Sequence, residues 1–168
     1  MNDSTKYPSI TSLKEIKLLK IFKDEDLQTL VKLGEDQEYE PYSNIVIEGE
    51  LTWGLYIILE GIVGIYKTNK LTGDNYDVGQ LRAGSFFGEM SLVDENARSA
   101  TVTSLTKVKA FYISKDKFYE FLNKGKDLPV KFYSSCIKDL VQRLRELDDD
   151  FVISQYQLWK TAVKKEAA

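Results

Sequence analysis

With 168 residues, 43% of them hydrophobic and 29% charged, the chain is long enough for one domain with a buried core. Its net charge of −3 and pI near 5.2 give no overall attraction to nucleic acid or anionic membranes, and no apolar run approaches the roughly 20 residues of a membrane span. Because histidine is absent, the commonest general base and metal ligand are missing, which argues against Ser-His or Cys-His catalysis and against a metal site.

Two helices are predicted near the N-terminus, over residues 12–20 and 24–33, because apolar residues recur there at helical spacing. Asp24 stands where an N-cap residue is expected. The first ten residues are polar and lack the charged-then-apolar layout of a signal peptide, so we expect no secretion signal.

Six short strands are predicted in the middle of the chain, from runs of β-branched and aromatic residues. Eight of the ten glycines lie between Gly49 and Gly88, where they separate these runs. The predicted strands are residues 45–48, 55–59, 62–66, 76–81, 99–103 and 108–113. This spacing favours an antiparallel arrangement over a parallel sheet with crossover helices. The expected fold is α+β and mainly β: an antiparallel β-roll (double-stranded β-helix or jelly roll) with N-terminal helices and a long C-terminal helix.

The C-terminal part is predicted to be helical. A short helix over residues 115–123 has Ser114 as its cap and Gly125 after its end. A longer periodic segment follows, with spacings of three and four: Val130, Tyr133, Ile137, Leu140, Leu144, Leu147, Phe151, Ser154 and Leu158. These four heptads fit either a helix laid on its own β-domain or a parallel homodimer seam. A seam of about 28 residues would span roughly 42 Å, more than a small domain easily covers, which favours the dimer. We therefore expect two regions, residues 1–128 and 129–168.

Residues 86–102 carry two charges in an unusual arrangement. Glu89 directly follows Gly88, and Arg98 lies nine residues further on. Glycine before a helical turn lets backbone N–H groups approach an anion, and Arg98 can offer it a forked pair of donors. Glu89 would repel that anion unless it accepts hydrogen bonds from hydroxyl groups beside it. Either residue alone would read as an ordinary surface charge, but together in one glycine-framed insert they indicate a site for a sugar phosphate.

These residues resemble the phosphate-binding cassette of cyclic nucleotide-binding domains, which occur in regulatory subunits of cAMP-dependent protein kinase, cyclic nucleotide-gated channels and bacterial catabolite activators. The matching stretches are Phe87-Gly-Glu-Met-Ser-Leu92 and Arg98-Ser-Ala-Thr-Val102. The strand sequences at 47–50, 55–61 and 63–66 are also similar, and the resemblance covers about residues 19–121. Ala97 stands where proline is frequent and Met90-Ser91 where Leu-Ala is common, but neither change removes a charged contact.

The resemblance implies that Glu89 accepts a hydrogen bond from the ribose 2′-hydroxyl and that Arg98 binds the cyclic phosphate. Ser99 would contact the phosphate or the base, which favours cAMP and leaves cGMP open. The implied ligand-binding residues are Phe87, Gly88, Glu89, Met90, Ser91, Arg98, Ser99 and Ala100, with Val78 and Leu81 as further candidates for the pocket wall. An aromatic side chain of the C-terminal helix (Tyr133, Phe151, Tyr156 or Trp159) is a candidate cover for the base.

The expected function is therefore a cyclic nucleotide sensor whose ligand repositions the C-terminal helices and signals to an effector protein, with no enzyme activity and no cofactor besides the ligand. After Leu158 too few residues remain for a helix-turn-helix, so DNA binding is not expected, and neither is membrane binding. Cys136 is the only cysteine, which indicates the reducing cytoplasm. The alternative is a dimeric adaptor with a degenerate fold that binds no nucleotide.

Overall fold

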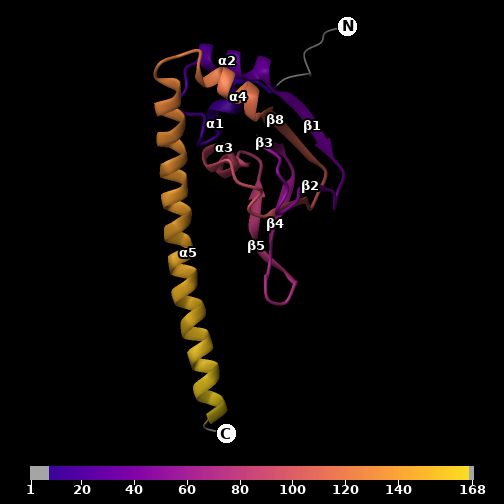
Figure 1. Ribbon diagram of the computed structural model, residues 1–168, viewed down its shortest axis with the longest axis vertical. Coiled ribbons are helices and arrows are strands. Elements are labelled where there is room, and N and C mark those ends of the chain that lie inside the picture. Colours follow the sequence, from indigo (N-terminus) through magenta and orange to yellow (C-terminus); the bar gives the residue numbers. More distant parts are fainter. Residues whose placement is uncertain (1–7, 167–168) are drawn as a thin grey trace.

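The computed structural model describes residues 8–166 and confirms a mainly antiparallel β core flanked by helices (Figure 1). Residues 1–7, on which most of the signal-peptide prediction rests, and residues 167–168 lie outside the described part. The elements are α1 (Ile10–Glu15), α2 (Asp24–Leu33), β1 (Glu35–Tyr39), β2 (Asn44–Val46), β3 (Gly54–Glu60), β4 (Ile62–Thr68), β5 (Asn75–Arg82), β6 (Phe86–Phe87), α3 (Glu89–Asp94), β7 (Thr101–Ser104), β8 (Val108–Ser114), α4 (Lys115–Leu122) and α5 (Leu128–Glu166).

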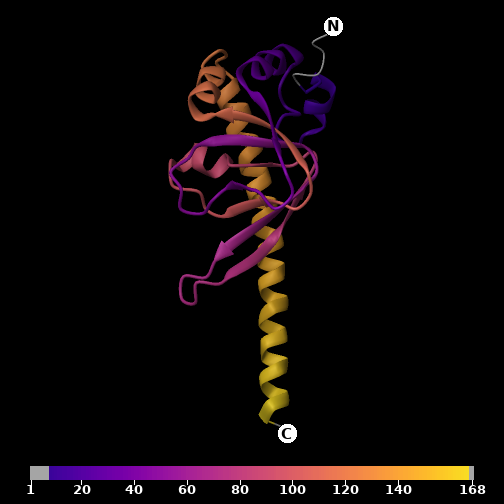
Figure 2. The same ribbon diagram turned by 90° about the vertical axis from the view of Figure 1, so that its right-hand side faces the viewer.

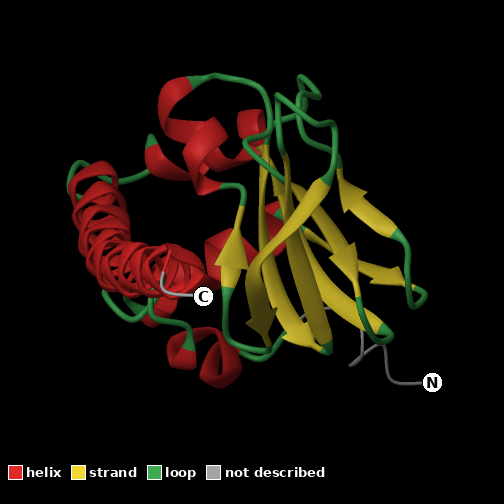
Figure 3. Cartoon of the chain, turned by 90° about the horizontal axis from the view of Figure 1, so that it is seen from below, coloured by secondary structure: helices red, strands yellow, loops and turns green. Residues whose placement is uncertain are grey.

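The described strands form two four-stranded sheets, in the orders β1-β8-β3-β6 and β2-β7-β4-β5. Every pairing within them is antiparallel. Seen along the molecule, the strands gather on one side and the helices on the other (Figure 3). The first sheet therefore lies between the helices and the second sheet.

Strand β3 lies in the middle of the molecule and is buried on both faces. Leu55 and Ile57 belong to an apolar cluster shared with the helices, whereas Tyr56 and Ile58 belong to a second cluster between the two sheets. Side chains alternate between the faces of a strand, so a strand with helices on one face and a sheet on the other must be apolar throughout. This explains why residues 55–59 read as a continuous apolar run.

Helix α5 packs on the domain only along its first turns. Leu128, Phe132 and Cys136 are buried in the cluster shared with the other helices, and the helix then runs past the β-roll (Figures 1 and 2). The predicted heptad face points elsewhere, because Ile137, Leu144 and other members are more than half exposed. The helix thus lies on its own domain through a face adjacent to the heptad stripe. No helix within residues 8–166 is both long and apolar enough to cross a membrane.

The first predicted helix is shorter than expected, because α1 ends at Glu15 and tight turns follow. Leu18 and Leu19 are both fully buried, and neighbouring side chains on one regular helix point in different directions. The turns allow both leucines to reach the core. Asp24 is the first residue of α2 rather than its N-cap, which is Lys23; the Lys23 N–H donates to the Asp26 carboxylate at 3.0 Å.

Strand β1 was not predicted, because its sequence, Glu-Asp-Gln-Glu-Tyr, has little of the β-branched character of strands. It pairs with β8, which supplies the opposite charges. Asp36 forms an ion pair with Lys109 at 3.0 Å, and Glu38 with Lys107 at 2.9 Å. The partner that stabilises β1 is thus about 70 residues away in the chain, beyond the reach of a local pattern. The two-residue β6 was also missed, and β7 begins at Thr101 rather than at residue 99.

Candidate functional site

A cavity of about 310 Å³ lies between the loop–α3 segment and the inner face of the second sheet. Its lining is mostly apolar with a few charged groups, as is common for small-molecule sites. The lining residues are Val46, Ile65, Lys67, Val78, Phe87, Gly88, Glu89, Met90, Ser91, Arg98, Ser99, Ala100, Val102 and Arg143. The eight residues predicted from the cassette therefore come together around one cavity, and Val78 joins them.

Leu81 does not border this cavity. It pairs with Val63 at the far end of β5 and packs against the apolar cluster between the sheets, beside a smaller hollow behind Arg143. A register shift in the β4–β5 ladder, where Ile65 pairs with Gly79 and Tyr66 with Asp77, leaves Val78 as the extra residue. The bulge thus gives Val78, and not Leu81, access to the cavity.

Gly88 makes the turn that places α3 against Arg98. Its φ of +90° lies in the left-handed region that glycine adopts without strain. A Cβ atom there would lie 2.3 Å from the Gly54 carbonyl oxygen and 2.6 Å from Arg98 Nη1. The backbone at Gly88 and the guanidinium of Arg98 are therefore close neighbours only because residue 88 has no side chain.

Arg98 is only 4% exposed, which is unusual for a guanidinium. Its Nε donates to Thr52 Oγ1 and its Nη1 to the Gly54 carbonyl, both at 3.2 Å. Its own backbone is tied to the β2–β3 loop, through its N–H to the Glu50 carbonyl and its carbonyl to the Gly49 N–H, each at 2.9 Å. Burial lowers the pKa of Arg98, yet no ion pair of Arg98 occurs in the described part of the chain. A buried cation without a carboxylate partner is costly unless an anion joins it.

Aromatic rings pack against the guanidinium of Arg98. Phe87 stacks on Tyr56 with ring centroids 4.8 Å apart and an interplanar angle of 3°. The Arg98 guanidinium carbon lies 5.7 Å from the centroid of the Tyr56 ring, within cation–π range. The stack connects the apolar cluster between the sheets to the base of the cavity, so the position of Arg98 is fixed by the core.

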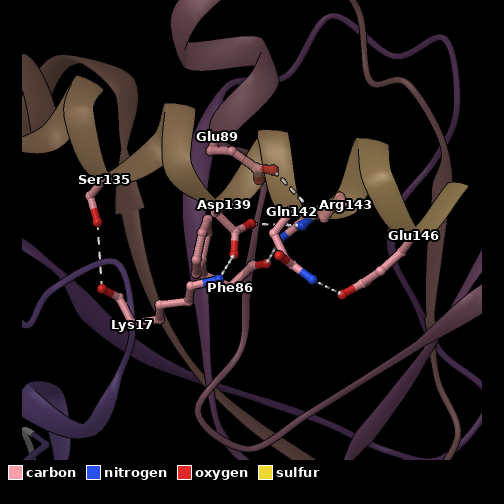
Figure 4. A network of polar contacts seen from close by, with 8 residues as sticks. All are labelled: Lys17, Phe86, Glu89, Ser135, Asp139, Gln142, Arg143 and Glu146. Atoms are coloured by element: carbon pink, nitrogen blue, oxygen red, sulfur yellow. Dashed lines mark hydrogen bonds and ion pairs between the residues drawn. The ribbon is translucent and has the colours of Figure 1, made fainter. Parts of the chain in front are cut away.

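Glu89 is 3% exposed and faces α5 rather than solvent. Its Oε1 accepts a hydrogen bond from Arg143 Nη1 at 3.1 Å, and Arg143 Nε pairs with Asp139 at 2.7 Å (Figure 4). Asp139 also lies 3.4 Å from the ammonium of Lys17, which links the N-terminal segment to this network. Burial raises the pKa of Glu89 above its ordinary value, while the Arg143 cation opposes that shift.

Sequence reasoning missed two charged residues of the cavity, Arg143 and Lys67. Arg143 is the one α5 residue among those that line it, and its guanidinium also lies 5.4 Å from the centroid of the Phe86 ring. None of the four candidate capping aromatics is among the lining residues. Phe151, for example, lies eight residues beyond Arg143, about 12 Å further along the helix.

A larger hollow of about 550 Å³ lies between α1 and the turn before β6. Its lining residues include Glu15 and Thr11 but no lysine or arginine. It therefore lacks the cations that an anionic ligand requires. The cavity at α3 combines a buried guanidinium with a buried carboxylate, an arrangement that suits one ligand carrying both an anionic group and hydroxyl groups.

A model of the cyclic nucleotide-binding domain matches residues 36–124, more than half of the chain. The chain belongs to this family, and the cassette resemblance is confirmed. The cAMP-dependent protein kinase regulatory subunit of Yarrowia lipolytica is 31% identical over 110 residues, which are 66% of this chain and 28% of that protein. This chain thus spans less than a third of that relative's length.

Solved structures share the fold. The Thermus thermophilus catabolite activator protein has a TM-score of 0.70 and 25% identity, with 82% of this chain and 62% of that chain covered. The regulatory domain of Toxoplasma gondii PKA with cAMP has a TM-score of 0.62 and 25% identity, with 67% and 42% covered. The β-roll with its flanking helices is therefore the fold of this family.

Proposed function

We propose that the chain is a cAMP-binding regulatory module that senses the nucleotide in the cavity beside α3. The observation that carries this proposal is the buried guanidinium of Arg98, which has no ion pair in the described residues and faces the same cavity as the buried carboxylate of Glu89. A cyclic nucleotide supplies a phosphate anion for the first and a ribose hydroxyl for the second. The relatives that bind cAMP by name, from kinase regulatory subunits to a cAMP receptor protein, support the choice of ligand.

The other cassette residues have roles that follow from their places. The backbone of Gly88 and Met90 borders the sugar phosphate, Phe87 packs beneath it, and Ser99 offers a hydroxyl that contacts the Met90 sulfur at 3.7 Å. Ser91 and Ala100 are small and leave room for the ligand. We propose only binding roles for these residues, in keeping with a sensor rather than an enzyme.

The Arg98→Leu variant tests the phosphate assignment. Removing two charge-assisted hydrogen bonds, at about 1.5–3 kcal/mol each, weakens cAMP binding roughly a hundredfold or more. Titration calorimetry measures this loss, with Arg82→Leu, an exposed arginine of β5 outside the cavity, as the matched control. Arg98→Lys keeps the positive charge but loses the forked pair of guanidinium donors, so we expect an intermediate affinity for cAMP. Equal affinity of the wild type and Arg98→Leu for cAMP would overturn the assignment.

We propose further that Arg143 transmits binding to α5. The ribose hydroxyl and Arg143 share the Glu89 carboxylate as acceptor, so the ligand changes the balance of contacts that hold α5 against the roll. Hydrogen exchange along α5 should change on adding cAMP in the wild type and change less in Arg143→Gln. An identical response in both proteins would remove Arg143 from the signal path.

The output surface is the heptad face of α5, which we propose forms a parallel homodimer seam that an effector protein then recognises. Leu144, Leu147 and Phe151 are each more than half exposed, and large apolar side chains in such a row favour a partner. Light scattering should give a mass near twice 19.3 kDa. Phe151→Asp should give a monomer, whereas Lys160→Asp, two and a half turns further along α5 and on its opposite face, should not. A monomeric wild type would contradict the seam.

The second candidate function is a cytoplasmic dimeric adaptor that binds no nucleotide. The observation that favours it is the exposed apolar face of α5. The two candidates differ in calorimetry. Heat with cAMP or cGMP supports the sensor, and no heat with either nucleotide or with a cyclic dinucleotide supports the adaptor.

A further inference from the structure

Lys67 is, with Arg143, one of the two charged lining residues of the cavity that the cassette does not include. It lies on β4 two residues after Ile65, and side chains two apart on a strand point to the same face. Ile65 pairs with Val102 across the β4–β7 ladder, and all three side chains line the cavity. Lys67 is thus an inward-facing position of the second sheet that carries a cation where its neighbours are apolar.

The Lys67 ammonium has two acceptors in the described residues. It forms an ion pair with Glu48 at 2.7 Å and donates a hydrogen bond to the Ser99 carbonyl oxygen. An ammonium carries three N–H donors. One donor therefore remains for an acceptor on a molecule in the cavity that Lys67 lines.

Lys67 and Arg98 both line the cavity but differ in burial, and we call the buried part at Arg98 its inner end and the more exposed part at Lys67 and Val78 its outer end. The Lys67 side chain is 48% exposed, whereas Arg98 is 4% exposed. A nucleotide whose phosphate meets the buried Arg98 would place its base against the more exposed lining residues of β4 and β5, which are Ile65, Lys67 and Val78. The apolar members suit the face of a purine, and the ammonium suits an acceptor on its edge.

The two purines differ at that edge. Guanine presents two adjacent acceptors, O6 and N7, which lysine binds well, whereas adenine presents N7 beside the N6 amino donor, which an ammonium disfavours. We propose that Lys67 is a base-selecting residue that favours a 6-oxo purine and so narrows the preference of this site for cAMP over cGMP. This inference rests on the proposed function, because it presumes that the phosphate meets Arg98.

The experiment is calorimetry with cAMP, cGMP and cIMP on the wild type, Lys67→Met, Lys67→Arg and Lys70→Met. Cyclic IMP has the 6-oxo group of cGMP without its 2-amino group, so it isolates the contact assigned to Lys67 from any made by Ser99. In Lys67→Met, the affinity for cGMP and for cIMP relative to cAMP should fall about fivefold to tenfold. Lys67→Arg keeps donors at the site and should keep the wild-type ratio, as should Lys70→Met, an exposed lysine of the β4–β5 turn that lies outside the cavity.

The ratio of affinities is measured within each protein, so a partial loss of folding does not change it. Because Lys67→Met leaves Glu48 without its cation, the double variant with Glu48→Gln repeats the test with both charges removed. Equal losses for all three nucleotides, or no change in the ratio, would overturn the inference and leave the proposed function standing. A wild type that binds none of them would overturn both.

Discussion

The two ends of the cavity differ in how deeply their charged side chains are buried. At the inner end, Arg98 and Glu89 are almost fully buried and are held by backbone carbonyls, a stacked aromatic pair and a helix. At the outer end, Lys67 of the internal strand β4 and Val78 at the bulge of the edge strand β5 are about half exposed. Burial strengthens each polar contact at the inner end, because competing water is excluded. At the outer end, water weakens the polar contacts, and the half-exposed side chains can adjust to different ligands. The inner end is therefore suited to affinity and the outer end to choice between ligands.

The largest expected effect comes from a single methyl group at the inner end. In Gly88→Ala the new Cβ would meet the Gly54 carbonyl at 2.3 Å in a left-handed conformation, so we expect a loss of about 2–4 kcal/mol in the free energy of unfolding. Gly84→Ala is the matched control, because its φ is +88° but nothing lies within 4 Å of the added atom; its cost should be about 1 kcal/mol. Urea denaturation measures both. Equal losses would mean that backbone strain alone, and not close packing on Arg98, explains Gly88.

A smaller effect is expected when the carboxylate at the inner end loses its charge. Glu89→Gln keeps the size of the side chain but weakens its hydrogen bond to Arg143 and the one proposed to the ribose hydroxyl, so cAMP affinity should fall about tenfold. The 2′-deoxy form of the nucleotide is the control, because it lacks the hydroxyl and should bind both proteins alike. A full tenfold difference with the deoxy nucleotide would place Glu89 elsewhere than at the ribose.

The smallest effect concerns the pH dependence of the outer end. Hydrogen bonds from the Lys67 ammonium and the Thr68 N–H hold the pKa of Glu48 at about 2, below its ordinary value of 4.5. A depressed carboxyl pKa stabilises the fold above pH 4.5, and this contribution is lost as the pH falls through about 2. Carboxyl chemical shifts measure the titration directly, and the pKa of Glu48 should rise toward 4.5 in Lys67→Met. An unchanged value would mean that Lys67 is not its partner in solution.

The inner end was predictable from the sequence because its residues lie close together in the chain. Gly88, Glu89 and Arg98 fall within eleven positions, and the turn chemistry that brings them together is local. The alternating strands were predictable for the same reason, since a period of two needs only a few residues to show itself.

At the outer end only Val78 was named from the sequence, whereas Lys67 and the α5 contact were missed because tertiary packing creates them. Arg143 is 54 residues from Glu89, although Phe132, Cys136 and Arg143 do form a stripe beside the heptad face that a second reading of the helix would reveal. The sequence also contains a sign of Lys67, because it is the charged third residue in the alternation Val63, Ile65, Lys67. An inward lysine in an apolar alternation indicates a cavity or an ion pair, and here Lys67 lines the cavity and forms a partly exposed ion pair with Glu48.

The most direct test of the central claim is to map the site with amide chemical shifts while cAMP is added to the isotope-labelled chain. If the cavity beside α3 is the nucleotide site, the largest shifts will fall on Gly88, Glu89, Met90 and Ser99, with smaller ones at Lys67 and Val78 and little change around the hollow at Thr11 and Glu15. Shifts centred on that hollow, or saturating cAMP without shifts at Gly88 and Glu89, would contradict the account.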